Sequence, residues 1–202
     1  MTKGIIALDA DGVLLDYNLA YASAWERAFG VYPKEKDPEA YWAIDRWEVE
    51  RLSGERLEQL RAGFDEMFWE TVPAMKGAVQ ACHALRAEGF DLVCVTALPE
   101  RFAVARQNNL RQLGFPIDTV IATDNVAISR SPKADALHAL QPVAFVDDHL
   151  PYMVGVHPDI HSALIMRGVN GSPNAGEHLQ AVKSTHGNLL AFAQWWLEGR
   201  TD

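Results

Sequence analysis

Short apolar runs alternate along this chain with longer segments in which apolar residues recur at helical spacing. Five runs have the length of buried strands, and most are rich in β-branched residues: Ile5–Asp9, Leu92–Thr96, Thr119–Ala122, Val143–Asp147 and Ala163–Met166. Helical patterns between the runs end at glycine, as Val79–Glu88 does at Gly89 and Arg101–Leu113 does at Gly114. Strands that alternate with helices predict an α/β fold, with a doubly wound, Rossmann-like parallel sheet covered by helices on both faces.

The region between the first and second predicted strands departs from this alternation. It has no strand pattern, it is densely charged, and it holds four of the six tryptophans. Three helices are predicted there, at Asn18–Phe29, Glu39–Leu52 and Glu55–Phe68. We therefore expect a helical insert at residues 17–74, and a core domain made of residues 1–16 and 75–202.

Three further features are expected in the second half of the core. Ser131 and Pro132 are typical of the N-cap and the first position of a helix, which places Lys133 in its first turn. The segment Gly168–Gly176 is rich in glycine and polar residues and predicts a surface loop. The apolar residues of Asn188–Glu198 predict a C-terminal helix that covers one face of the sheet.

Composition narrows the classes of partner and compartment. The 202 residues are 49% hydrophobic and 22% charged, as in ordinary globular proteins, and the net charge of −9 disfavours nucleic acid or an anionic membrane as the main partner. Cys82 and Cys94 lack the spacing of a disulfide framework or a zinc site, so we expect both in the core. The sequence has no signal segment and no apolar run of membrane-spanning length, and we expect a cytoplasmic monomer or homodimer.

The first predicted strand ends in the strongest chemical signal of the chain. Asp9 and Asp11 are spaced i, i+2, so their side chains point the same way in an extended segment, and Gly12 follows at once. Carboxylates placed this closely repel each other, and such a site needs a cation, a shared proton or a chemical task. For this segment alone, a polar turn after a strand is the simpler alternative.

Polar residues also stand at the ends of two other predicted strands and at a helix start. Thr96 closes the second strand, Asp147 and Asp148 close the fourth, and Lys133 begins a helix. In a doubly wound sheet these positions meet at one edge, where ligands bind. Such a set suits phosphoryl transfer to a carboxylate, because Mg²⁺ prefers oxygen ligands, while a lysine and a hydroxyl group can bind phosphate oxygens.

In order and spacing, these segments resemble the four motifs of the haloacid dehalogenase (HAD) superfamily. The resemblance implies hydrolysis of a small phosphorylated metabolite, with Asp9 as the nucleophile that forms an aspartyl-phosphate and Asp11 as the general acid and base. It also implies phosphate-binding groups at Thr96, Ala97 and Lys133.

The same resemblance implies a Mg²⁺ site. Asp9, Asp148 and the backbone carbonyl of Asp11 are the expected ligands, and Asp147 is expected to support them. The residues alone leave open which acid of the Asp147–Asp148 pair binds the ion directly.

The resemblance covers about residues 4–16 and 75–166, and the insert between the first two motifs resembles a C1-type cap. Only 36 residues separate Thr96 from Lys133, which leaves no room for a second type of cap. The dehalogenases of the superfamily lack an acid at the position of Asp11, so cleavage of a carbon–halogen bond is disfavoured. The Asp-Asp ending also resembles the 5′(3′)-deoxyribonucleotidase branch, without specifying a substrate.

Residues of the insert are candidates for substrate specificity. Asp16 and Tyr17 begin the insert and could contact substrate when a cap closes, although a hinge or surface role is equally consistent with their position. Arg46 and Arg51 lie on a predicted helix and could reach an anionic substrate, but a solvated face is the simpler role for each.

Two other functions use similar residues. A phosphomutase or phosphotransferase would form the same aspartyl-phosphate and pass the phosphoryl group to a hydroxyl group instead of water. A non-catalytic phospho-receiver also carries an acid cluster, a threonine and a lysine, but its acid pair belongs to the first strand and it has no helical insert.

Overall fold

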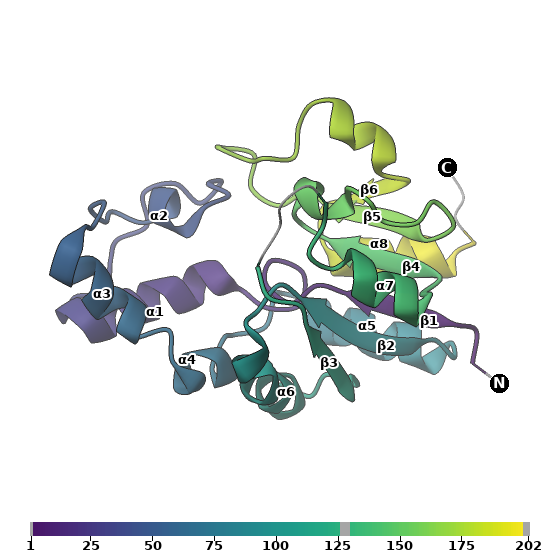
Figure 1. The fold of residues 1–202 in the computed structure, drawn as a ribbon, viewed down its shortest axis with the longest axis horizontal. Helices are drawn as coiled ribbons and strands as arrows, with labels where there is room; N and C mark the ends of the chain where they lie inside the picture. The colour runs from purple at the N-terminus through teal and green to yellow at the C-terminus, as the bar shows by residue number, and fades with distance from the viewer. Residues whose placement is uncertain (1, 126–129, 200–202) are drawn as a thin grey trace.

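A computed structural model describes residues 2–125 and 130–199. Six parallel strands form one sheet in the order β3-β2-β1-β4-β5-β6 (Figure 1). The strands are β1 (Ile5–Leu8), β2 (Asp91–Thr96), β3 (Thr119–Ala122), β4 (Ala144–Asp147), β5 (His161–Ile165) and β6 (Ser184–His186). The order reverses at β1, which lies between β2 and β4 and is buried from Ile6 to Leu8. The predicted doubly wound α/β fold is confirmed.

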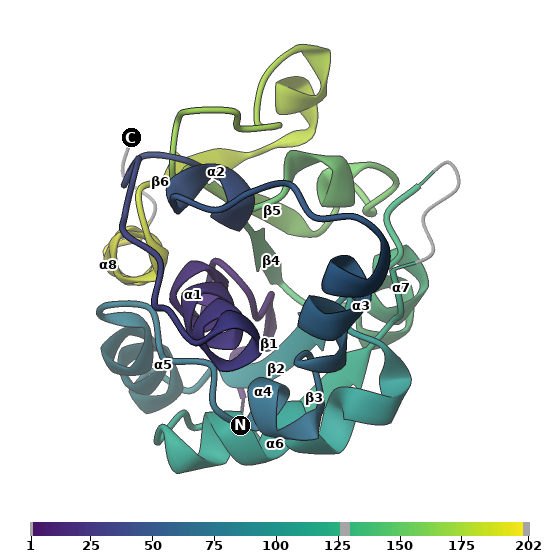
Figure 2. The ribbon, with the colours of Figure 1, turned by 90° about the vertical axis from the view of Figure 1, so that its left-hand side faces the viewer.

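Helices cover both faces of this sheet. Successive residues of β1 point to opposite sides, so Ile6 and Leu8 join one apolar cluster and Ala7 joins the other. The first cluster includes residues of α5 (Ala78–Ala87), α6 (Ala103–Gln112) and α8 (Leu189–Leu197), and the second includes α7 (Ala134–Leu140). Figure 2 shows α5 and α8 on one side of the sheet and α7 on the other.

The region after β1 is a helical insertion, hereafter the cap. It contains α1 (Tyr17–Phe29), α2 (Ala43–Arg46), α3 (Gly54–Ala62) and α4 (Glu66–Glu70), and it lies beyond the carboxyl ends of the strands (Figure 1). The chain leaves and re-enters the core side by side, since the N–H of Asp16 donates to the carbonyl of Pro73 and that of Met75 to the carbonyl of Leu14, both at 2.8 Å.

Two of the predicted cap helices are wrong in extent. Glu39–Leu52 is helical only over α2, because extended pairing with residues 34–37 takes over at Arg46, whose carbonyl accepts the N–H of Lys36 at 2.8 Å. Glu55–Phe68 is divided into α3 and α4, and Asp65 begins the second helix by accepting the N–H of Phe68 at 2.9 Å.

Three differences affect the core. The strand β6 was not predicted, because Ser-Thr-His at the edge of the sheet has no apolar pattern. Lys133 is the N-cap of α7 rather than a residue of its first turn, although Ser131 Oγ still accepts the N–H of Lys133 at 3.2 Å. Short 3-10 helices occupy Glu100–Phe102 (η1), Leu150–Met153 (η2) and Glu177–Ala181 (η3).

The predicted surface loop Gly168–Gly176 is partly a contact between core and cap. The N–H of Tyr41 donates to the carbonyl of Asn170 at 3.0 Å, and the N–H of Asn170 donates to that of Glu39, also at 3.0 Å. Asn174 of the same loop is only 5% exposed. We call this pairing of residues 39–42 with 168–171 the strap. No helix within the described ranges is long and apolar enough to cross a membrane.

Candidate active site

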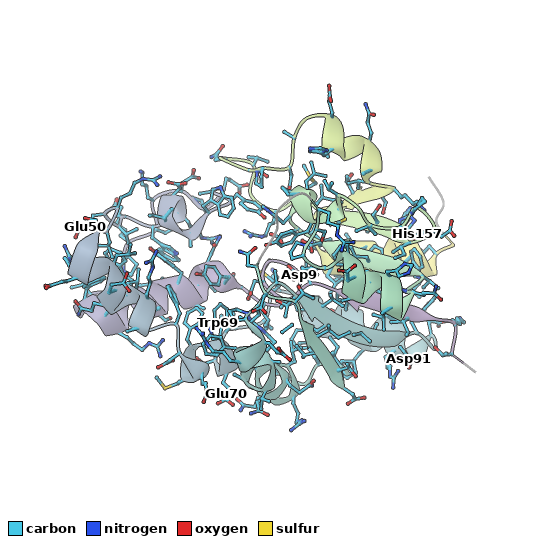
Figure 3. All side chains as sticks on the ribbon, in the orientation of Figure 1. Asp9, Glu50, Trp69, Glu70, Asp91 and His157 are labelled. Atoms are coloured by element: carbon cyan, nitrogen blue, oxygen red, sulfur yellow. The ribbon has the colours of Figure 1, made fainter. Side chains whose placement is uncertain are left out.

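Three buried carboxylates converge where β1 and β4 end. Asp9, Asp147 and Asp148 each offer an oxygen atom within 4.8 Å of the others. Asp9 is held at the sheet edge by its N–H, which donates to the carbonyl of Val146 at 2.9 Å. Because β1 and β4 are adjacent and parallel, their short apolar runs bring the acids that follow them together. Figure 3 shows Asp9 at the junction of cap and core.

Lys133 reaches this cluster from the start of α7. Its Nζ lies 2.5 Å from Asp9 Oδ1 and 2.6 Å from Asp147 Oδ2, and its side chain has no exposed surface. Burial by itself would lower the pKa of Lys133, but the Asp147 and Asp9 carboxylates reverse this effect and raise the pKa. Lys133 is therefore a fixed cation beside Asp9.

Asp148 has a cation of its own, Arg167, which follows β5. Arg167 Nε lies 2.5 Å from Asp148 Oδ2, while Nη1 donates to the carbonyl of Tyr41 in the cap at 3.0 Å. Burial raises the pKa of Asp148 to about 6, and Arg167 acts in the opposite direction. Gly12 (φ +93°) passes so close to this pair that a Cβ would overlap both side chains. Asn174 Nδ2 donates to the Asp148 carbonyl at 2.7 Å.

Asp11 points toward a different cation. Arg106 Nη2, on α6, lies 2.9 and 3.0 Å from the two Asp11 oxygens. The Arg106 side chain is fully buried, whereas 28% of the Asp11 side chain is exposed. Burial raises the pKa of Asp11, and Arg106 is the largest influence that lowers it. Among the four acids of the site, Asp11 is thus the one with a clearly exposed side chain, and the buried Arg106 binds its carboxylate from the core side.

Thr96 and Ala97 follow the strand next to β1. Leu8 is in register with Cys94, so Thr96 is level with the segment that carries Asp9. Thr96 is 2% exposed, and Ala97 is partly buried. The predicted site residues of the core thus all lie at one edge of the sheet.

The predicted specificity residues of the cap line its inner side. Asp16 also caps α1, since its Oδ1 accepts the N–H of Leu19 at 3.0 Å. Asp16, Tyr17 and Arg46 border a cavity of about 70 Å³ together with Gly12 and Arg167 of the core. This volume is far below the roughly 300 Å³ at the lower end of small-molecule pockets, so this cavity as it stands is too small for a metabolite.

Arg46 and Arg51 both have acidic partners in the cap. Arg46 lies 2.8 Å from Glu35, and Arg51 lies 3.1 Å from Asp45. Arg51 also borders a larger hollow of about 510 Å³ in the cap.

Sequence reasoning missed Arg106, Arg167 and Tyr41. The signal for Arg106 was its position, because it shares a helix face with Leu110, four residues on, and a charged residue on an apolar face needs a buried partner. Arg167 stands just after the apolar end of a parallel strand, where ligand-edge residues are expected. Tyr41 gave no signal, because its contact depends on how the cap folds.

The carboxylate cluster is compatible with a metal-ion site. Its donors are oxygen atoms, and four carboxyl groups of the site (Asp9, Asp11, Asp147 and Asp148) face three cationic side chains. A divalent cation fits this donor set, while Lys133 and Arg167 already neutralise much of its charge.

Comparison with known proteins was made at three levels. No protein-family model and no curated protein sequence matches the chain. Solved structures do match along nearly the whole chain. A HAD family hydrolase from Deinococcus radiodurans, with bound phosphate and sodium, has a TM-score of 0.63 at 15% identity, over 97% of this chain and 95% of that one.

Two other matching structures belong to proteins described with different activities. A protein provisionally assigned as a β-phosphoglucomutase, from Thermotoga maritima, has a TM-score of 0.60 at 19% identity, over 98% of this chain and 100% of that one. The L-2-haloacid dehalogenase of Xanthobacter autotrophicus, with chloropropionic acid covalently bound, has a TM-score of 0.61 at 13% identity over the full length of both. At these identities the similarity concerns the fold, and the chain has the fold of the haloacid dehalogenase superfamily.

Proposed function

We propose that this chain is a Mg²⁺-dependent phosphomonoester hydrolase that acts on a small phosphorylated metabolite. The observation that carries the proposal is the buried ammonium group of Lys133, 2.5 Å from Asp9. This cation lies beside the carboxylate that would attack phosphorus, and it can balance the charge of that carboxylate and of a phosphate oxygen. Asp11 supplies a second, partly exposed carboxyl group two residues on. The phosphate bound in the Deinococcus radiodurans structure supports the assignment of the ligand class.

In the first step, an oxygen of Asp9 forms a bond to phosphorus while the bond from phosphorus to the ester oxygen breaks. Asp11 donates its proton to that leaving oxygen. In the second step, Asp11 takes a proton from water, the water oxygen bonds to phosphorus, and the bond from Asp9 to phosphorus breaks. Phosphate leaves, and both aspartates return to their first state.

The remaining site residues bind and balance charge. Thr96 and Ala97, at the end of β2, and Lys133, at the start of α7, are proposed to bind the phosphate oxygens. Asp9, Asp148 and the backbone carbonyl of Asp11 would hold Mg²⁺, which when bound supplies positive charge against the phosphate oxygens.

The test is release of phosphate from a panel of phosphorylated metabolites, with Mg²⁺ and with a chelator. We expect turnover that needs the metal, and its abolition in Asp9→Asn. The matched control is Asp118→Asn, an exposed aspartate just before the amino end of β3, at the opposite edge of the parallel sheet from the acids, which should retain activity. Phosphate release that persists in Asp9→Asn would refute the role of the nucleophile.

A phosphomutase is the second candidate, favoured by the Thermotoga maritima structure. It would use the same two aspartates, with a sugar hydroxyl group as the acceptor. Conversion of one phosphosugar into its isomer without net phosphate release would identify it. Halide release from a 2-haloacid would instead identify a dehalogenase, which the presence of Asp11 disfavours.

A further inference from the structure

Arg106 is an arginine with no exposed surface on α6, a helix whose neighbouring side chains Ala105 and Leu110 are also buried. A buried guanidinium group needs a compensating charge. In the part of the chain that the structure describes, the carboxylate that forms an ion pair with Arg106 is Asp11, at 2.9 Å. Both oxygens of Asp11 are engaged by Nη2, so the contact determines the direction of the carboxylate as well as its charge.

Arg106 is itself held from two sides. Its guanidinium group lies over the ring of Trp69 from the cap helix α4, 5.2 Å from the ring centroid. Asn109 Oδ1 lies 3.5 Å from Arg106 Nη1, and Asn109 Nδ2 donates to the carbonyls of Glu70 and Val72 at 2.9 and 3.0 Å. The arginine is therefore positioned by its own helix and by the segment in which the cap returns to the core. Figure 3 labels Trp69 and Glu70 in this region.

The hydrogen bonds of Arg106 indicate which contact determines its orientation. Within the described residues, its buried Nε has no acceptor, and an unpaired buried donor is unfavourable. In this orientation Nη2 meets both oxygens of Asp11 while Nε stays unpaired.

We propose that Arg106 is a positioning residue, which aims the Asp11 carboxyl group at the leaving oxygen of the substrate. The inference rests on the proposed function, because it needs Asp11 to act as general acid and base. Arg106 Nη2 lies on the two oxygens of Asp11, and 28% of the Asp11 side chain is exposed, so the arginine would act through Asp11.

A comparison of substrates with different leaving groups distinguishes a positioning role of Arg106 from a purely structural one. Asp11 acts as the acid in the first step and as the base in the second, and kcat/KM reports on the first step alone. In that step a p-nitrophenolate leaving group departs without a proton, whereas an alkoxide needs one, so loss of Asp11 alignment should strongly lower kcat/KM only for alkyl phosphates. We would measure kcat and KM for p-nitrophenyl phosphate and for the best alkyl phosphate of the metabolite panel. The variants are Arg106→Met and Arg106→Lys, and the control is Arg111→Met, an exposed arginine on the same helix.

Since general acid–base catalysis contributes about 10²–10⁴-fold, Arg106→Met should lower kcat/KM for the alkyl phosphate by about 10²-fold and for the aryl phosphate by less than about 10-fold. Arg106→Lys should recover part of the loss. An equal loss of kcat/KM on both substrates, or no loss, would overturn the positioning role. If Arg106→Met does not fold, the same comparison in Arg106→Lys decides. A wild-type protein that hydrolyses neither compound would refute the proposed function, and the role of Arg106 with it.

Discussion

Replacement of Asp11 by asparagine should destabilise the protein as well as inactivate it, because Asp11 neutralises a fully buried arginine. Arg106 Nη2 lies 2.9 and 3.0 Å from the two oxygens of Asp11. Removal of one member of a fully buried ion pair costs roughly 3–5 kcal/mol. Here 28% of the Asp11 side chain is exposed, and the asparagine oxygen can still accept one hydrogen bond. We therefore expect a loss of about 2 kcal/mol in the free energy of unfolding.

The assay is thermal and urea unfolding of four proteins: wild type, Asp11→Asn, Arg106→Met and the double variant. For a chain of this length, 1 kcal/mol corresponds to roughly 2–4 °C, so the Tm of Asp11→Asn should fall by about 4–8 °C. The double variant has no unpaired buried charge, and it should be more stable than Asp11→Asn alone. The exposed Asp118→Asn serves as the matched control.

Two results would refute the reasoning. A Tm of Asp11→Asn within about 1 °C of the wild type would mean that Arg106 does not depend on this carboxylate for its charge balance. Strict additivity of the two single changes would mean that the two side chains are not coupled, since contacting residues normally show a coupling energy of about 0.5–3 kcal/mol.

The remaining predictions concern other parts of the molecule. Lys133→Met should lower kcat by at least about 10²–10³-fold, because it removes the buried cation beside the nucleophile, and a normal rate in steady-state assays would contradict this. Gly168→Ala should cost about 1 kcal/mol and loosen the strap, because Gly168 has φ +55° and an added Cβ would lie 3.0 Å from a cap carbonyl. Faster amide hydrogen exchange at Tyr41, which donates to Asn170, would report the loosening, and unchanged exchange would count against it. Burial lowers the pKa of His186, so the unfolded chain takes up this proton first as the pH falls below about 6.5, and stability is lost on that side. His186→Phe should therefore lose less stability than the wild type between pH 7 and 5. If the free energies of unfolding in urea fell equally with pH in both proteins, His186 would not be the group responsible.

The sheet and its acids were predictable because each depends on short, local patterns. A buried parallel strand is a run of four or five apolar residues, and the polar residue that follows it must lie at the ligand edge. Asp9, Thr96 and the Asp147–Asp148 pair could be placed in this way. The same reasoning failed for β6, a polar strand at the edge of the sheet that is defined only by its pairing with β5.

The cap and the cations were less predictable because they depend on contacts between distant segments. The residues of Glu39–Leu52 have adequate helical spacing, yet their backbone pairs with residues 34–37, which no local pattern announces. The positions of Arg106 and Arg167 indicate that each needs a partner, but no local pattern says which one. Only the arrangement of elements shows that a carboxylate lies next to each, 95 and 19 residues away in the sequence.

The three cationic side chains of the site, Lys133, Arg106 and Arg167, differ in whether they contact the cap. Lys133 has both of its carboxylate partners in the core, at the ends of β1 and β4. Arg106 lies over the ring of Trp69, and Arg167 lies 4.2 Å from the ring centroid of Tyr41 and donates to its carbonyl, so both arginines contact the cap. A displacement of the cap would therefore leave the environment of the nucleophile intact, while it changed the surroundings of the general acid and of the proposed metal ligand. In the proposed mechanism, the carboxylate that attacks phosphorus is therefore preorganised in the core, while the groups that complete the reaction would respond to movement of the cap.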